Sequence, residues 1–99
     1  MDDGVTELEQ RSRIYQDETI ARIRVLEVPS SETYPRGVKY AFHYGVRGAP
    51  NPIIRFDNHH GPDELHLETE TFELNRPALT TLRNAWIAAL PAAKRSDWR

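Results

Sequence analysis

The sequence predicts an α+β domain in which an antiparallel meander of four or five strands carries one C-terminal helix packed on one face. Apolar and polar side chains alternate in several short segments between residues 11 and 68, as they do in strands with one buried face. Short runs rich in Pro, Gly, Asp and Asn join these segments, and such lengths suit hairpins but not parallel crossovers. Only residues 75–91 place apolar side chains at helical spacing.

Five segments have the strand pattern, at residues 11–16, 19–28, 38–46, 53–57 and 64–68. In the clearest of them, Tyr40, Phe42 and Tyr44 line one face, while Lys39 and His43 line the other. The aromatic face, together with the apolar residues of the neighbouring strands, is predicted to form the core beneath the helix. The core set is Ile23, Val25, Tyr40, Phe42, Tyr44, Ile54, Phe56, Leu65 and Leu67, with Leu79, Leu82 and Trp86 from the helix.

The apolar phase slips by one residue before Phe72 and Leu74, which indicates that the last strand has ended or contains a bulge. We favour an ending, because the next stretch has the features of a helix start. Asn75 is a predicted N-cap and Pro77 suits the first turn. Pro91 ends the helix. Residues at helical spacing are Leu79, Leu82, Trp86, Ala89 and Leu90.

The predicted domain organisation is a flexible N-terminus over residues 1–9, a single domain over 10–91 and a tail over 92–99. A chain of 99 residues with 38% hydrophobic side chains supports one thin core. Such a domain has a stability on the order of 5 kcal/mol. A partner chain or a homodimer would add to that stability.

The composition of the chain argues against several classes of protein. The chain has no cysteine, so disulfides and thiolate zinc sites are absent. No apolar run approaches the ~20 residues of a membrane span, and the N-terminus lacks the pattern of a secretory signal. We therefore expect a cytoplasmic protein that does not associate with membranes.

Arginine dominates the cations, with eleven Arg against two Lys, although the net charge is −2. If the aromatic face is buried, the opposite sheet face carries Arg11, Arg13, Tyr15, Arg22, Arg24, Lys39, His43, Arg55, Asp57 and His66. Arginine suits bidentate phosphate recognition, so Arg22, Arg24 and Lys39 are candidate nucleic-acid contacts. The alternative is an ordinary solvated sheet face, and the acidic sequence pI of ≈ 6.1 favours that alternative.

The run Arg55-Phe56-Asp57-Asn58-His59-His60-Gly61 gathers an acid, an amide and two imidazoles where a strand becomes a loop. With neighbouring strands it predicts a catalytic set of His43, Arg55, Asp57, His59, His60 and His66. A histidine oriented by aspartate, an arginine and a second histidine suffice for metal-independent RNA cleavage at the 2′-hydroxyl. Asp57 and the histidines could also ligate a metal, but adjacent histidines on an extended chain point apart. We expect neither a metal nor a cofactor.

The sequence also resembles the TumE-like proteins, a family of toxins from toxin–antitoxin pairs. The matching run comprises Val28-Pro29, Ser31-Glu32, Tyr34-Pro35, Gly37-Val38-Lys39-Tyr40, Phe42, Tyr44 and Arg55-Phe56-Asp57-Asn58-His59-His60. The likeness covers roughly residues 26–61 and ends after Gly61. It implies a small intracellular toxin with a cognate DNA-binding antitoxin, and RNA is the target that the basic face favours. The competing hypothesis is a non-enzymatic interaction module that docks a partner on its sheet face or edge.

Overall fold

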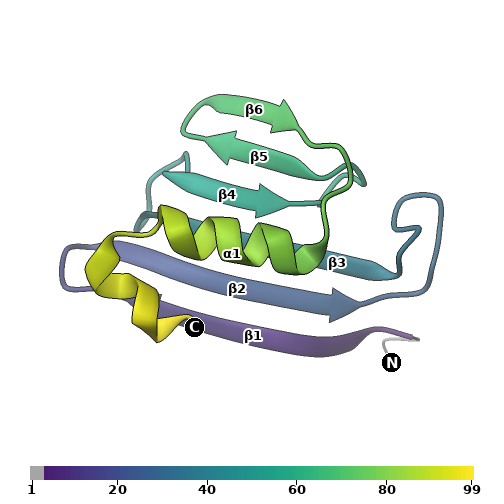
Figure 1. Ribbon diagram of the computed structural model, residues 1–99, viewed down its shortest axis with the longest axis horizontal. Helices are drawn as coiled ribbons and strands as arrows, with labels where there is room; N and C mark the ends of the chain where they lie inside the picture. The colour runs from purple at the N-terminus through teal and green to yellow at the C-terminus, as the bar shows by residue number, and fades with distance from the viewer. Residues whose placement is uncertain (1–3) are drawn as a thin grey trace.

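The computed structural model describes residues 4–99 as one six-stranded antiparallel sheet with an α-helix lying across one face (Figure 1). The strands follow the chain in spatial order and are β1 (Thr6–Ile14), β2 (Thr19–Glu27), β3 (Val38–Val46), β4 (Ile54–Asp57), β5 (Glu64–Leu67) and β6 (Glu70–Glu73). The helix α1 (Leu79–Ala89) and a 3₁₀ helix, η1 (Ala92–Asp97), come last. The predicted α+β meander is confirmed, with a sixth strand. No helix in residues 4–99 is long and apolar enough to cross a membrane.

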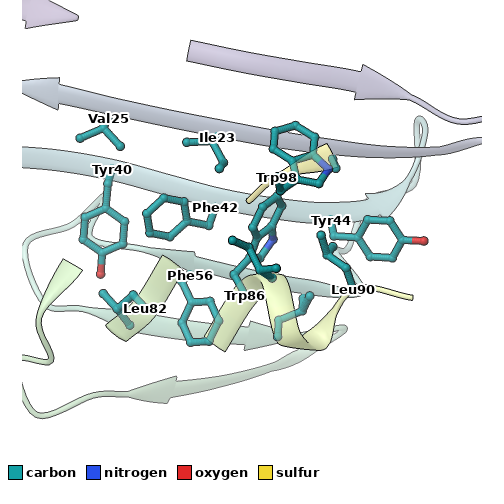
Figure 2. Close-up of a cluster of buried hydrophobic side chains, with 13 residues drawn as sticks. Ile23, Val25, Tyr40, Phe42, Tyr44, Phe56, Leu82, Trp86, Leu90 and Trp98 are labelled. Carbon is teal, nitrogen blue, oxygen red and sulfur yellow. The ribbon is translucent and has the colours of Figure 1, made fainter. Parts of the chain in front are cut away.

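The core lies between α1 and the central strands β2, β3 and β4 (Figure 2). Phe42 is fully buried, and its ring centroid lies 6.2 Å from that of Trp86 on the helix. Leu82 is also buried, as its place in the helical pattern predicted. Leu67 is an exception, because its strand lies beyond the helix and leaves its side chain 37% exposed.

β1 is longer than predicted and its faces are reversed. It begins at Thr6, so only residues 1–3 of the predicted flexible segment lie outside the described residues. Arg11 pairs with Ile23 and Arg13 with Ala21, and residues opposite each other in a sheet share a face. Arg11 and Arg13, followed by Tyr15, therefore lie on the helix side. The alternation in this strand is too polar to fix its phase from sequence.

The slip in apolar phase marks a hairpin rather than the end of the sheet. β5 and β6 are joined by a tight turn in which Glu68 has a φ of 54°, and Leu65 pairs with Phe72. At the turn the chain reverses, so the apolar residues of β6 are out of step in sequence with those of β5 and still lie on the same face of the sheet. The irregular stretch after β6 contains Asn75, and the helix begins only at Leu79 without a side-chain cap.

The predicted tail is part of the folded body. Trp98 is 2% exposed, and its ring centroid lies 5.2 Å from that of Trp86 in an edge-to-face contact. Its indole N–H donates to the Tyr15 hydroxyl at 3.0 Å, and that hydroxyl donates to Asp97 at 3.0 Å. These contacts fasten η1 against the end of the sheet near β1 and β2 (Figure 1).

Candidate functional site

The polar face of the sheet places six of the predicted site residues in two neighbouring cross-strand rows, whereas Lys39 lies opposite Leu26 and His59 and His60 lie in the loop after β4. In the first row, Ser12, Arg22, His43, Arg55, His66 and Thr71 lie opposite one another from β1 to β6. In the second row, the corresponding residues are Gln10, Arg24, Ala41, Asp57, Glu64 and Glu73. The positive charges occupy β2 to β4, and the acids occupy β4 to β6.

Asp57 is the centre of the site and is only 3% exposed. Its Oδ2 lies 2.7 Å from Arg55 Nε and 3.3 Å from His66 Nε2. Its Oδ1 accepts the backbone N–H of His59 at 3.1 Å. The sequence predicted that this carboxylate orients one of the histidines, without deciding which one. In the structure it contacts His66, although His43 and His66 both lie opposite Arg55 and neither lies opposite Asp57.

His66 connects the carboxylate to a hydroxyl. Its Nε2 faces Asp57, with Glu64 Oε1 at 3.6 Å, and its Nδ1 lies 3.1 Å from Thr71 Oγ1. Carboxylate, imidazole and hydroxyl thus form a chain across β4, β5 and β6. In such a chain the carboxylate orients the ring, so that the opposite nitrogen can take a proton from a hydroxyl. The roles of Glu64 and Thr71 were missed, because they depend on the β5–β6 hairpin.

Asn58 fixes the place where the chain leaves β4. Its side-chain oxygen accepts the Tyr40 N–H at 2.9 Å, and its Nδ2 donates to the Val38 carbonyl at 2.8 Å. The side chain therefore continues the bonding to β3 after the backbone has turned away. This contact holds the following exposed loop, in which the rings of His59 and His60 meet edge to face with centroids 5.0 Å apart.

His43 has a different environment from the other imidazoles. Burial lowers its pKa most, and the nearby charges of Arg55 and Arg22 lower it further, to about 4. Arg55 Nη1 lies 3.4 Å from His43 Nδ1. Because a guanidinium can only donate, Nδ1 accepts and the proton of the neutral ring lies on Nε2. His43 is therefore neutral at pH 7 and does not serve there as a charged acid.

Two adjoining cavities open on this face. The first, of ≈ 340 Å³, is the basic groove and is lined by Gln10, Ser12, Arg22, Arg24, Leu26, Lys39, Tyr40, Ala41, His43, Arg55 and His59. The second, of ≈ 360 Å³, lies over the chain of Asp57, His66 and Thr71, which we call the Asp57 cluster. His60 also lines this cavity. Arg55 and His59 belong to both linings, so the arginine-rich groove leads directly to the acid–imidazole cluster.

Three of these residues could also bind a cation. Asp57, Glu64 and His66 each direct one ligand atom toward the others, and these atoms lie within 4.8 Å of one another. Carboxylate and imidazole are suitable ligands for several divalent metals. However, Arg55 already contacts the same oxygen of Asp57 and supplies a positive charge there. His59 and His60, which the sequence had suggested as ligands, are not part of this group.

Fold and site together define a small α+β protein with an arginine-lined groove beside an acid–imidazole cluster. The model of the protein family described as Toxin TumE matches residues 2–90, and the chain belongs to this family. The match confirms the resemblance and extends it beyond Gly61, through α1. No curated protein and no solved structure was found to match the chain. Membership supports a role as a toxin and implies an antitoxin partner.

Proposed function

We propose that this chain is an RNA-directed toxin that binds single-stranded RNA in the basic groove and cleaves it at the Asp57 cluster without a metal. One observation carries the proposal: Arg55 and His59 form walls of both the groove and the cluster cavity. A phosphate backbone held by Arg22, Arg24 and Lys39 would therefore continue into reach of the imidazoles. Arginine-lined grooves suit phosphates, and acid–base groups beside them suit transfer of the 2′-hydroxyl proton.

Each residue has a chemical task in this proposal. His66, oriented by Asp57, takes the proton of the ribose 2′-hydroxyl on Nδ1, which now faces the Thr71 hydroxyl. Arg55 neutralises the charge that develops on the phosphate. An exposed loop imidazole, His59 or His60, protonates the leaving 5′-oxygen. Neutral His43 holds the Arg55 guanidinium in place and lines the groove.

The test of the chemistry is Asp57→Asn, measured as growth arrest on expression and as RNA cleavage by the purified protein. Asparagine keeps the shape and part of the hydrogen bonding but removes the charge that orients the His66 ring. We expect loss of toxicity with the fold preserved. We expect the same result for His66→Ala and for at least one of His43→Ala, His59→Ala and His60→Ala.

A chelator separates this proposal from a metal-dependent reaction at Asp57, Glu64 and His66. We expect wild-type cleavage to continue in its presence. Full toxicity of every one of these variants would contradict the acid–base proposal. Harmless expression of the wild type would contradict it equally.

The second candidate is a non-enzymatic interaction module, and the exposed edge of β1 is the observation that favours it. Leu8 and Ile14 of β1 are 55% and 54% exposed, and Val5, just before the strand, is 40% exposed. If binding alone arrests growth, Asp57→Asn would remain toxic while substitutions at the edge of β1 would not.

A further inference from the structure

The outer edge of β1 has free hydrogen-bonding groups. Within residues 4–99, β1 pairs only with β2, and with nine residues it is much longer than the other edge strand, β6, with four. The Tyr15 N–H donates to the Thr19 carbonyl at 2.8 Å. Bonded and outward-facing residues alternate along an antiparallel strand, so the N–H groups of Gln10, Ser12 and Ile14 point away from β2. An unpaired row of this kind is a template for another strand.

The usable part of the edge is residues 9–14, because a shift in register between Glu7 and Glu9 interrupts the strand there. On the groove side, the exposed and uncharged Gln10 and Ser12 lie opposite Arg24 and Arg22. On the helix side, the edge carries two partly exposed arginines. The side chains of Arg11 and Arg13 are 43% and 57% exposed.

The charged side chains around the edge of β1 indicate which kind of strand would pair with it. Arg22 and Arg24 on one face, and Arg11 and Arg13 on the other, would flank an added strand. Asp97 contacts Arg11 through its carbonyl and Arg13 through its carboxylate at 3.1 Å, and Glu9 is held by Arg83. With these two acids counted, the side chains around the edge still have a net positive charge. An acidic extended segment complements it, since opposite charges on neighbouring strands stabilise a sheet.

A second copy of the chain fits this edge less well. The two antiparallel registers that overlap residues 9–14 most fully place Arg11 opposite either Arg11 or Arg13 of the copy. Like charges directly opposite each other destabilise a strand pair.

We propose that the antitoxin partner adds an acidic strand to the edge of β1. Such a strand would lie ~4.8 Å from β1 and about twice that distance from β2. The short Ser12 side chain leaves room above it, so a glutamate of the added strand can reach toward Arg22. The partner would thereby occupy the groove in place of RNA. This part of the inference rests on the proposed function, whereas the strand addition does not.

The test compares Ser12→Pro with Ser12→Ala. Proline removes the outward N–H and leaves the ladder to β2 intact, whereas alanine keeps that N–H. The probe is the purified product of the gene adjacent to the toxin gene, and its affinity is measured by titration calorimetry. We expect binding about tenfold weaker for Ser12→Pro and unchanged for Ser12→Ala, with equal thermal midpoints. Equal affinity of both variants would overturn the proposal, as would a neighbouring product that does not bind the wild type.

Amide exchange of the wild-type complex provides a readout that does not depend on how the proline variant folds. We expect slower exchange at Gln10, Ser12 and Ile14 when the partner is bound, because their N–H groups become bonded. Unchanged exchange along β1 would place the partner elsewhere. A wild-type dimer that Ser12→Pro dissociates would assign the edge to a second copy instead. Salt-dependent RNA binding of the wild type is measured in parallel. If the wild type does not bind RNA while the partner still protects β1, the proposed function fails and the strand addition stands.

Discussion

At the scale of single residues, His43 and His66 show that two histidines with the same register can have different chemistry because their side chains meet different partners. Both are imidazoles on the polar face, and both lie opposite Arg55 from adjacent strands. His66 meets the carboxylate of Asp57, whereas His43 meets the guanidinium of Arg55. One is oriented by an acid and the other is held neutral, so their tasks in acid–base chemistry differ.

The low pKa of His43 predicts a pH dependence of stability. Its pKa is about 4 in the folded chain, while a histidine in the unfolded chain has a pKa near 6.5. The unfolded state therefore binds more protons between these values, and stability falls as pH decreases from about 6.5 to about 4. The free energy of unfolding should therefore fall by roughly 1–2 kcal/mol across this window, which is less than the full pKa difference would give, because the ring is partly open to solvent.

His43→Asn removes this titration, and the comparison isolates it from the carboxylates that titrate at lower pH. Urea unfolding at several pH values should show a smaller loss of stability for the variant across this window. Parallel curves for wild type and variant would show that the folded chain does not disfavour the charged imidazole.

Part of the site could be predicted from the sequence, because Arg55 and Asp57 are two residues apart on one strand. That spacing places both side chains on the same face, and the loop after Asp57 was evident from Asn58 and Gly61. The link from Asp57 to His66 could not be predicted in the same way. It depends on which residues lie opposite each other, and the intervening loop lengths set that register.

At the scale of elements, the sequence patterns predicted correctly whether each long segment is a strand or a helix. They were less successful in predicting where the strands and the helix begin. The aromatic alternation of β3 and the spacing of Leu82 and Trp86 were sufficient for the core. The polar β1 and the short β5–β6 hairpin were misjudged, because neither buries enough apolar surface to show its phase. Trp98 was unplaced for a related reason, since one aromatic residue has no periodicity.

The helix contributes to stability mainly through Trp86, which is fully buried against Phe42 and Trp98. We expect Trp86→Ala to reduce the free energy of unfolding by about 3–5 kcal/mol, enough to unfold so small a domain. The Nε1 group of Trp86 has no hydrogen-bond partner within residues 4–99.

Trp86→Phe is the matched comparison. It keeps an aromatic ring and removes the unsatisfied donor, whose burial is itself unfavourable. Thermal and urea unfolding should show a clearly smaller loss for phenylalanine than for alanine. A cooperative Trp86→Ala protein with an unchanged midpoint would show that this face of α1 is not the core.

At the scale of the whole molecule, the distribution of charge matters more than its sum. The net charge of −2 and the pI of ≈ 6.1 argue against a nucleic-acid binder when taken alone. The pairing of the strands separates the signs, with arginines over β2 to β4 and glutamates over β5 and β6. A local positive groove can attract a polyanion even when the chain as a whole is acidic.

This separation makes the salt dependence of RNA binding the decisive whole-molecule measurement. On single strands, log Kd against log salt changes by about 0.7 for each phosphate neutralised. If Arg22 and Arg24 each meet one phosphate, the double replacement by alanine should make the slope shallower by about 1.4 and leave the fold intact. The matched control replaces Arg47 and Arg99, which are exposed and line neither the groove nor the Asp57 cavity. That control has the same net charge as the test variant. An equal change of slope in both variants would show that overall charge, and not contact with phosphates, causes the effect. A slope that stays the same after loss of Arg22 and Arg24 would remove the groove from the RNA site, because counterion release counts only the cations that contact phosphates.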